Sequence, residues 1–158
     1  MTIAVEEKTG QGLVSEDLFN RLVSRIQEEH SIDYGQAAAI MDQALAFLGT
    51  CAVTTERLSP SAQVDIGWHT FILYTRHYRE FCDRAAGRFI DHEPNDSDEN
   101  KGGRGASVVT TDAIRKAGYA VDLDLWTAPS AKCNDGEKCR ASGNDGNENT
   151  DTNDPDKR

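Results

Sequence analysis

The sequence predicts an all-α fold, a compact bundle of four to five helices with a disordered acidic C-terminal tail. Apolar residues recur at three- and four-residue spacing through most of residues 14–127, which is the period of amphipathic helices. After Pro129 large apolar residues almost disappear, and Asn, Asp and Gly dominate. We therefore expect a flexible N-terminus at 1–13, one helical domain at 14–127 and a disordered tail at 128–158.

The composition excludes several classes of partner. The chain has 158 residues and a formal net charge of −10, with 27 acidic and 17 basic side chains. Nucleic-acid surfaces need clustered Lys and Arg, and anionic membranes attract the same residues, so neither partner is expected. No apolar run approaches the ~20 residues that span a bilayer, and the N-terminus lacks the pattern of a signal peptide. These features predict a cytoplasmic protein.

The first two helices have clear start signals. Ser15 is a suitable N-cap, and the acidic residues Glu16 and Asp17 follow in the first turn, where the helix dipole favours them. Asp33 is the corresponding cap of the second helix, and Gln36 three residues later completes a capping-box pattern. Apolar residues cover more than half of the second helix, so we expect it to be the most buried. Its small alanines would let neighbouring helices approach closely.

Residues 59–92 should form two further helical segments. Ser59 and Pro60 form a helix start, because the hydroxyl caps free amides and proline needs no amide donor there. Thr75 can cap the second segment, and Gly87 suits the left-handed position that ends it. The apolar positions of the two segments are Val64, Trp68, Phe71, Ile72, Tyr78, Phe81, Cys82 and Ala85.

The chain becomes less regular after His92. Residues 93–106 are polar, acidic and glycine-rich, which is typical of a mobile loop. A short amphipathic helix is predicted at 108–117, with Gly118 as its stop. The sequence VDLDLW at 121–126 then offers apolar side chains that should fold back over the bundle.

Four polar side chains of this region form a candidate metal site. Asp65 and His69 are four residues apart and therefore share one flank of a helix. Cys82 and His92 follow one segment later and could converge on them. A thiolate with two imidazoles suits zinc, with copper or iron as alternatives. Asp65 would be the fourth ligand, or would hold the second ring nitrogen of His69.

Two other interpretations of the same residues remain open. In the first there is no metal: Asp65 pairs with His69, Trp68 fills the core, Cys82 is a buried thiol and His92 caps a chain end. In the second, Cys82 is a nucleophile with His69 as base and Asp65 as the orienting group. The helical, apolar setting of Cys82 and the lack of a visible oxyanion donor disfavour that second interpretation.

A spaced set of residues also suggests a family. The set comprises VDIGWHT at 64–70, Tyr78, Cys82, Gly87, His92, Gly118 and Trp126. On these residues the chain resembles the glycine-rich-domain-containing-protein-like family in its short bacterial form, over roughly residues 15–127. The resemblance implies an all-helical fold and a site region that includes Trp68 and Tyr78, but no reaction. The long glycine-rich segment of the plant members is missing here, so nothing attributed to that segment carries over.

From these observations we expect a small cytoplasmic helical binding or accessory module with a His/Cys metal site and an unidentified protein partner. One alternative is a metal-dependent enzyme that uses the same site. Another is a recognition domain whose tail is a modification substrate through Cys133 and Cys139. The spacing of these two cysteines, C-x5-C, is a weak match to structural zinc motifs.

Overall fold

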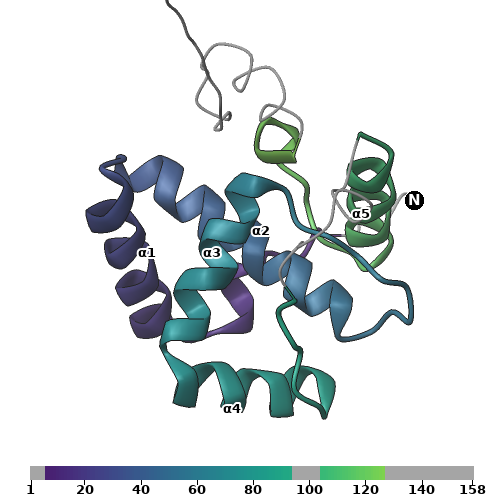
Figure 1. Ribbon diagram of the computed structural model, residues 1–158, viewed down its shortest axis with the longest axis horizontal. Coiled ribbons are helices and arrows are strands. Elements are labelled where there is room, and N and C mark those ends of the chain that lie inside the picture. The colour runs from purple at the N-terminus through teal and green to yellow at the C-terminus, as the bar shows by residue number, and fades with distance from the viewer. Residues whose placement is uncertain (1–5, 94–103, 127–158) are drawn as a thin grey trace, which may run out of the picture.

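The computed structural model describes residues 6–93 and 104–126 (Figure 1). Its helices are, in chain order, the 3₁₀ turn η1 (Gln11–Leu13), α1 (Glu16–His30), α2 (Tyr34–Cys51), α3 (Ala62–Leu73), α4 (Thr75–Ala86) and α5 (Arg104–Lys116). The predicted all-α bundle is confirmed, because these described ranges contain no β-strand and only one isolated bridge, between Lys8 and Tyr119. None of the helices seen in them is both long and apolar enough to cross a membrane.

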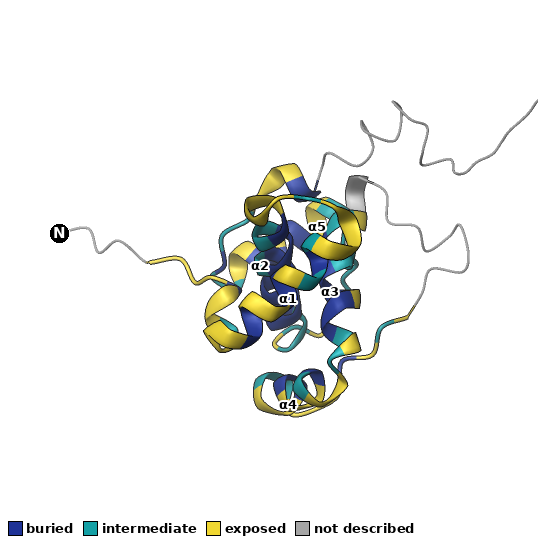
Figure 2. Ribbon diagram, turned by 90° about the vertical axis from the view of Figure 1, so that its left-hand side faces the viewer, coloured by how far each residue is buried: buried dark blue, intermediate teal, exposed yellow. Residues whose placement is uncertain are grey.

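Helix α2 forms the centre of the bundle, as its sequence predicted. Most of its residues are buried, and α1, α3, α4 and α5 all contact it. Helices α1 and α5 lie on opposite sides of α2, and α4 lies across one end of the other helices (Figure 1). Figure 2 shows the buried residues gathered where α1, α2 and α3 face one another. The hydrophobic core is therefore continuous from α1 to the segment after α5.

Helices α2 and α3 meet at a glycine. A Cβ atom on Gly67 would lie 2.6 Å from the Cβ of Ala44 and 3.1 Å from the carbonyl oxygen of Ile40. Real Cβ atoms do not approach other atoms so closely, so no other residue fits this position without a shift of the helices. The close contact places α3, which carries Asp65 and His69, directly on the central helix.

The local signals at three helix ends are confirmed. The Oγ of Ser15 accepts a hydrogen bond from the N–H of Leu18 at 3.2 Å. Similarly, Oδ1 of Asp33 accepts from the N–H of Gln36 at 2.8 Å. Gly87 ends α4 in the left-handed region, with φ of 69°. Each signal works within one helical turn, which is why the sequence alone reveals it.

The start of α3 differs from the prediction. Ser61, and not Ser59, is the N-cap, and its Oγ accepts from the N–H of Val64 at 3.1 Å. Ser59 instead pairs with Thr110 of α5: the hydroxyl of Thr110 donates to the Ser59 carbonyl at 3.1 Å. A contact with a distant part of the chain thus holds Ser59 outside the helix, and the cap moves two residues onward.

The start of α4 also differs. Thr75 was predicted to cap this helix, but it is the first helical residue, and Tyr74 is the N-cap without a side-chain hydrogen bond. Tyr74 also ends α3, since its N–H donates to the carbonyl of Phe71 at 2.9 Å. The two helices are therefore joined through a single residue, and this sharp turn sets the direction of α4.

The N-terminal region is more ordered than predicted over part of its length. Lys8 donates its backbone N–H to the carbonyl of Gly118 at 2.8 Å. The N–H of Gln11 donates to Oδ1 of Asp42 on α2 at 2.8 Å. Residues 8–13, which we expected within a flexible N-terminus, are thus packed on α2 and on the segment after α5.

The predicted start of α5 differs from the structure, and the predicted loop and tail are mostly not among the described residues. Helix α5 begins at Arg104, four residues before the predicted start at 108, and Gly118 follows its end with φ of 98°. Most of the predicted mobile loop, 93–106, and the whole predicted tail, 128–158, lie outside the described residues.

The segment after α5 folds back over the bundle, as predicted. Its anchor is Gln43, a buried residue of α2. The Nε2 of Gln43 donates to the carbonyl of Ala120 at 3.0 Å, and its Oε1 accepts from the N–H of Asp122 at 3.1 Å. The same oxygen accepts from the indole N–H of Trp126 at 2.8 Å. One buried amide therefore satisfies three polar groups of this segment.

Candidate metal site

Three of the four predicted ligands meet at the edge of α3. Asp65 and His69 lie one turn apart on this helix, and His92 lies in the non-helical segment that follows α4. Potential ligand atoms of these three residues all lie within 4.8 Å of one another. We call them the Asp65 cluster. The structure thus brings together two helical neighbours and a histidine 27 positions from Asp65.

The carboxylate of Asp65 faces one nitrogen of each of the two imidazoles. Its Oδ1 is 2.9 Å from Nε2 of His92, and its Oδ2 is 3.4 Å from Nδ1 of His69. The centroids of the two rings are 4.3 Å apart. Because an ionised carboxylate can only accept, Nε2 of His92 is the donor in the 2.9 Å hydrogen bond. Each carboxylate oxygen is therefore directed at a different histidine.

The cluster is open to solvent on one side. The side chain of His92 is 16% exposed and that of Asp65 is 27% exposed, whereas that of His69 is 60% exposed. His92 is the inner residue, packed against the indole of Trp68 with ring centroids 4.3 Å apart. An ion or a small molecule would therefore approach from the side of His69.

The fourth predicted ligand, Cys82, is not brought to this cluster. Its side chain is completely buried in the hydrophobic core, beside the hydroxyl of Tyr78. The turn at Tyr74 directs the buried face of α4 into the core, and Cys82 lies on that face. The remaining ligand set contains nitrogen and oxygen but no sulfur. The same placement removes the geometric basis for a Cys82–His69 nucleophile and base pair.

Trp68 and Tyr78, which the resemblance placed in the site region, lie directly behind the cluster. The indole N–H of Trp68 donates to the hydroxyl oxygen of Tyr78 at 2.9 Å. That hydroxyl donates in turn to the carbonyl oxygen of Ile90 at 2.6 Å. Burial raises the pKa of Tyr78, so its hydroxyl stays protonated near neutral pH and remains a donor. The carbonyl of Ile90 was not predicted, because a backbone group gives no signal in the sequence.

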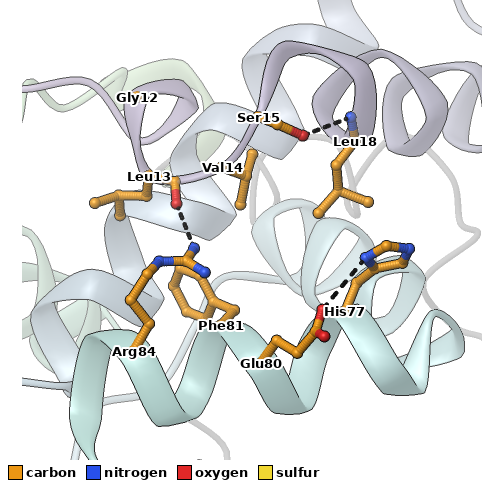
Figure 3. Close-up of a pocket in the computed structure, with 9 residues that line it drawn as sticks. All are labelled: Gly12, Leu13, Val14, Ser15, Leu18, His77, Glu80, Phe81 and Arg84. Carbon is orange, nitrogen blue, oxygen red and sulfur yellow. Dashed lines mark hydrogen bonds and ion pairs between the residues drawn. The ribbon is translucent and has the colours of Figure 1, made fainter.

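A separate pocket of about 340 Å³ lies between the start of α1 and one face of α4 (Figure 3). Two of its polar side chains already have neighbours of complementary polarity within the protein. The guanidinium of Arg84 donates to the carbonyl of Leu13 at 2.8 Å, and Nδ1 of His77 is 3.8 Å from a carboxylate oxygen of Glu80. We therefore regard the Asp65 cluster, and not this pocket, as the candidate functional site.

Comparison with known families gives one match and one correction. Residues 11–109 match the family described as UCP032817-like. This match overturns the predicted resemblance to the glycine-rich-domain-containing-protein-like family. Most residues that had suggested that resemblance, from Val64 to His92, lie inside the UCP032817-like match. No curated protein and no solved structure matches the chain.

Proposed function

The chain belongs to the UCP032817-like family, and from this premise and the geometry of the Asp65 cluster we propose that it is a metal-binding helical module. The family description carries no activity, so the proposal depends on the cluster. Asp65, His69 and His92 would hold one divalent transition-metal ion, with zinc as the first choice. The observation that carries the proposal is the proximity of the three ligand atoms, within 4.8 Å of one another.

The spacing of the cluster suits a small cation. Zinc–nitrogen and zinc–oxygen distances of about 2.0–2.1 Å place neighbouring ligands of a tetrahedral ion about 3.4 Å apart. The two separations from the Asp65 oxygens to the histidine nitrogens are 2.9 and 3.4 Å. All three ligand atoms lie within 4.8 Å of one another, so the side chains would have to adjust their positions around the ion. Three protein ligands would leave the fourth position to water or to a group from another molecule.

The ligand chemistry narrows the choice of metal. Two imidazole nitrogens and one carboxylate oxygen suit zinc, iron(II) and copper(II), whereas copper(I) prefers sulfur ligands. Cys82 lies in the core, so its soft thiolate is not part of the ligand set. Zinc is our choice because three ligands with an open position form a common zinc arrangement. Iron and copper are the competing ions in the test.

The open side of the cluster supports the role of a binding or accessory protein. His69 is the most exposed of the three ligands, so a side chain of a protein partner could reach the fourth position from solvent. A metal-dependent enzyme would use the same position for a water molecule or a substrate. We place the protein in the cytoplasm, since Cys51 and Cys82 are free thiols. No nucleic-acid or membrane partner is proposed.

Metal titration of the purified chain tests the proposal. Protein prepared without an affinity-metal step is freed of metal and titrated calorimetrically with zinc, iron(II) and copper(II). We expect one zinc ion per chain, and loss of at least tenfold in affinity in the His69→Ala and His92→Ala variants. His77→Ala is the matched control, because His77 also stands on a helix beside a carboxylate but outside the cluster. Equal affinity in all three variants would contradict the proposal.

The competing role of the cluster is mechanical. The 2.9 Å hydrogen bond from His92 to Asp65 fastens the segment after α4 to α3 without any metal. In that case Asp65→Asn would lower the stability of the metal-free protein, and added zinc would leave the stability of the natural chain unchanged. A rise in the midpoint of unfolding with zinc concentration favours the metal function, because a ligand of the native state stabilises it by mass action.

A further inference from the structure

We infer that Tyr78 is a positioning residue of this site, an inference that rests on the proposed metal function. Its buried hydroxyl fixes the carbonyl of Ile90 and thereby determines where His92 stands relative to Asp65. The hydroxyl of Tyr78 is bonded to Trp68 and Ile90 and is not among the potential ligands of the cluster. It acts through two residues of backbone.

His92 needs such support because it lies on no helix. Residues 88–93 are outside the helices, and within residues 6–93 and 104–126 no backbone–backbone hydrogen bond holds them. Asp65 and His69, in contrast, are fixed by the backbone of α3. The position of His92 therefore depends on side-chain contacts of its segment. Ile90 provides the main one, since it is only 5% exposed and belongs to the hydrophobic core.

The hydroxyl of Tyr78 is held in a single orientation. An indole nitrogen can only donate, so Trp68 occupies the acceptor side of the hydroxyl and its proton must point at Ile90. The ring of Tyr78 is fixed as well. It packs edge-to-face against Phe71 and Phe89, with centroids 5.2 and 5.4 Å away. A rigid donor thus meets the carbonyl of Ile90 at 2.6 Å.

Loss of the Tyr78 hydroxyl would change the position of His92. Without it, the Ile90 carbonyl and the indole N–H of Trp68 lose their buried partners, which is costly in the core. The segment would move to bring the carbonyl toward water. His92, two residues later, would then leave its place against Trp68 and Asp65. Metal ligation tolerates errors of only about 0.2 Å, so even a small movement weakens binding.

The test compares Tyr78→Phe with Ile114→Val, both measured as full-length protein. Ile114 is also fully buried, but it lies on α5, so its shortening destabilises the core without touching the segment of His92. We expect Tyr78→Phe to weaken zinc binding about tenfold, the lower end of the effect of groups that support metal ligands. Ile114→Val should bind zinc like the natural chain. Equal losses in the two variants would reduce Tyr78 to a general structural role and overturn the inference.

A second measurement separates this inference from the proposed function. In metal-free protein, the ¹⁵N shifts of the His92 ring report which nitrogen carries the proton. The natural chain should show the proton on Nε2, where it is bonded to Asp65. In Tyr78→Phe the ring should shift toward a mixture of tautomers, whereas Ile114→Val should leave it unchanged. Absence of zinc binding in the natural chain would refute the metal function alone. An unchanged His92 ring in Tyr78→Phe would refute the positioning role.

Discussion

Trp126 donates its indole N–H to Oε1 of Gln43 at 2.8 Å, and so joins the end of the described chain to the central helix. The two residues are 83 positions apart. Gln43 also forms hydrogen bonds with the carbonyl of Ala120 and the N–H of Asp122. Its side-chain amide therefore satisfies two backbone groups of this segment. These three hydrogen bonds between the C-terminal segment and α2 all involve this one side chain.

Replacing Gln43 by Leu should therefore be strongly destabilising. The variant leaves the buried N–H of Trp126 and two backbone groups without a partner, which we expect to cost about 2–4 kcal/mol. Urea unfolding measures the effect. Gln36→Leu is the control, since Gln36 is an exposed residue of the same helix and should change stability by about 0.5 kcal/mol or less. Comparable stability of the two variants would mean that the hydrogen bonds to Gln43 contribute little.

Zinc binding should strengthen with rising pH. An imidazole binds a metal ion through an unprotonated nitrogen, so an imidazolium must lose a proton before it can act as a ligand. Protons and zinc thus compete for the cluster, and affinity should be lower at about pH 5.5 than at about pH 7.5. Calorimetry in buffers of different ionisation enthalpy counts the protons released. Equal zinc affinity at the two pH values would contradict this competition.

Stability should fall in alkaline solution partly because of Tyr78. Burial raises the pKa of its hydroxyl above the ordinary value of 10.0. The native state then holds the proton more tightly than the unfolded chain, so the stabilisation is complete below pH 10 and is lost as the pH rises beyond it. Tyr78→Phe should flatten this loss in urea unfolding between about pH 9 and 11. Tyr34→Phe, at an exposed position, should follow the natural chain.

The thiols should differ in reactivity. Burial raises the pKa of Cys51 to about 12, so little thiolate is present near neutral pH. Cys82 is shielded because its side chain is completely buried. Brief alkylation followed by peptide mass spectrometry should modify Cys133 and Cys139 first, since the composition of residues 128–158 predicts a disordered tail. Faster labelling of Cys51 than of either tail cysteine would contradict this order.

Gly67→Ala should destabilise the bundle although alanine favours helices. The new methyl group would lie 2.6 Å from the Cβ of Ala44, and the strain should cost about 1–3 kcal/mol, against a propensity gain of up to about 1 kcal/mol. Gly35→Ala is the matched control at the exposed start of α2, where the nearest atom is a carboxylate oxygen of Asp33 at 3.6 Å. That variant should be neutral or more stable, and thermal unfolding compares the two.

The sequence predicted those features of the fold that are decided within a helical turn. The caps at Ser15 and Asp33 and the stop at Gly87 depend only on their neighbours, and all three are confirmed. The cap of α3 was misplaced because Ser59 is bonded to Thr110, 51 positions away. No local pattern contains that contact.

The candidate site could also be predicted only as far as it depends on residues of one helix. Helix geometry predicts that Asp65 and His69, four residues apart, share one flank of α3. The structure agrees, because Nδ1 of His69 lies 3.4 Å from Oδ2 of Asp65. Whether Cys82 or His92 would join them depends on the direction of α4 after the turn at Tyr74. A period of 3.6 residues identifies the face on which Cys82 lies, but not whether that face points to the site or to the core.

The glycine contact between α2 and α3 limits how the site could be reproduced elsewhere. Asp65 and His69 flank Gly67 on a helix whose register is set by the surface of Ala44 and Ile40. A synthetic peptide of residues 59–93 would contain all three histidine and aspartate ligands and yet lack that surface. Grafting these ligands onto a new scaffold would therefore also require the part of the central helix that packs against Gly67.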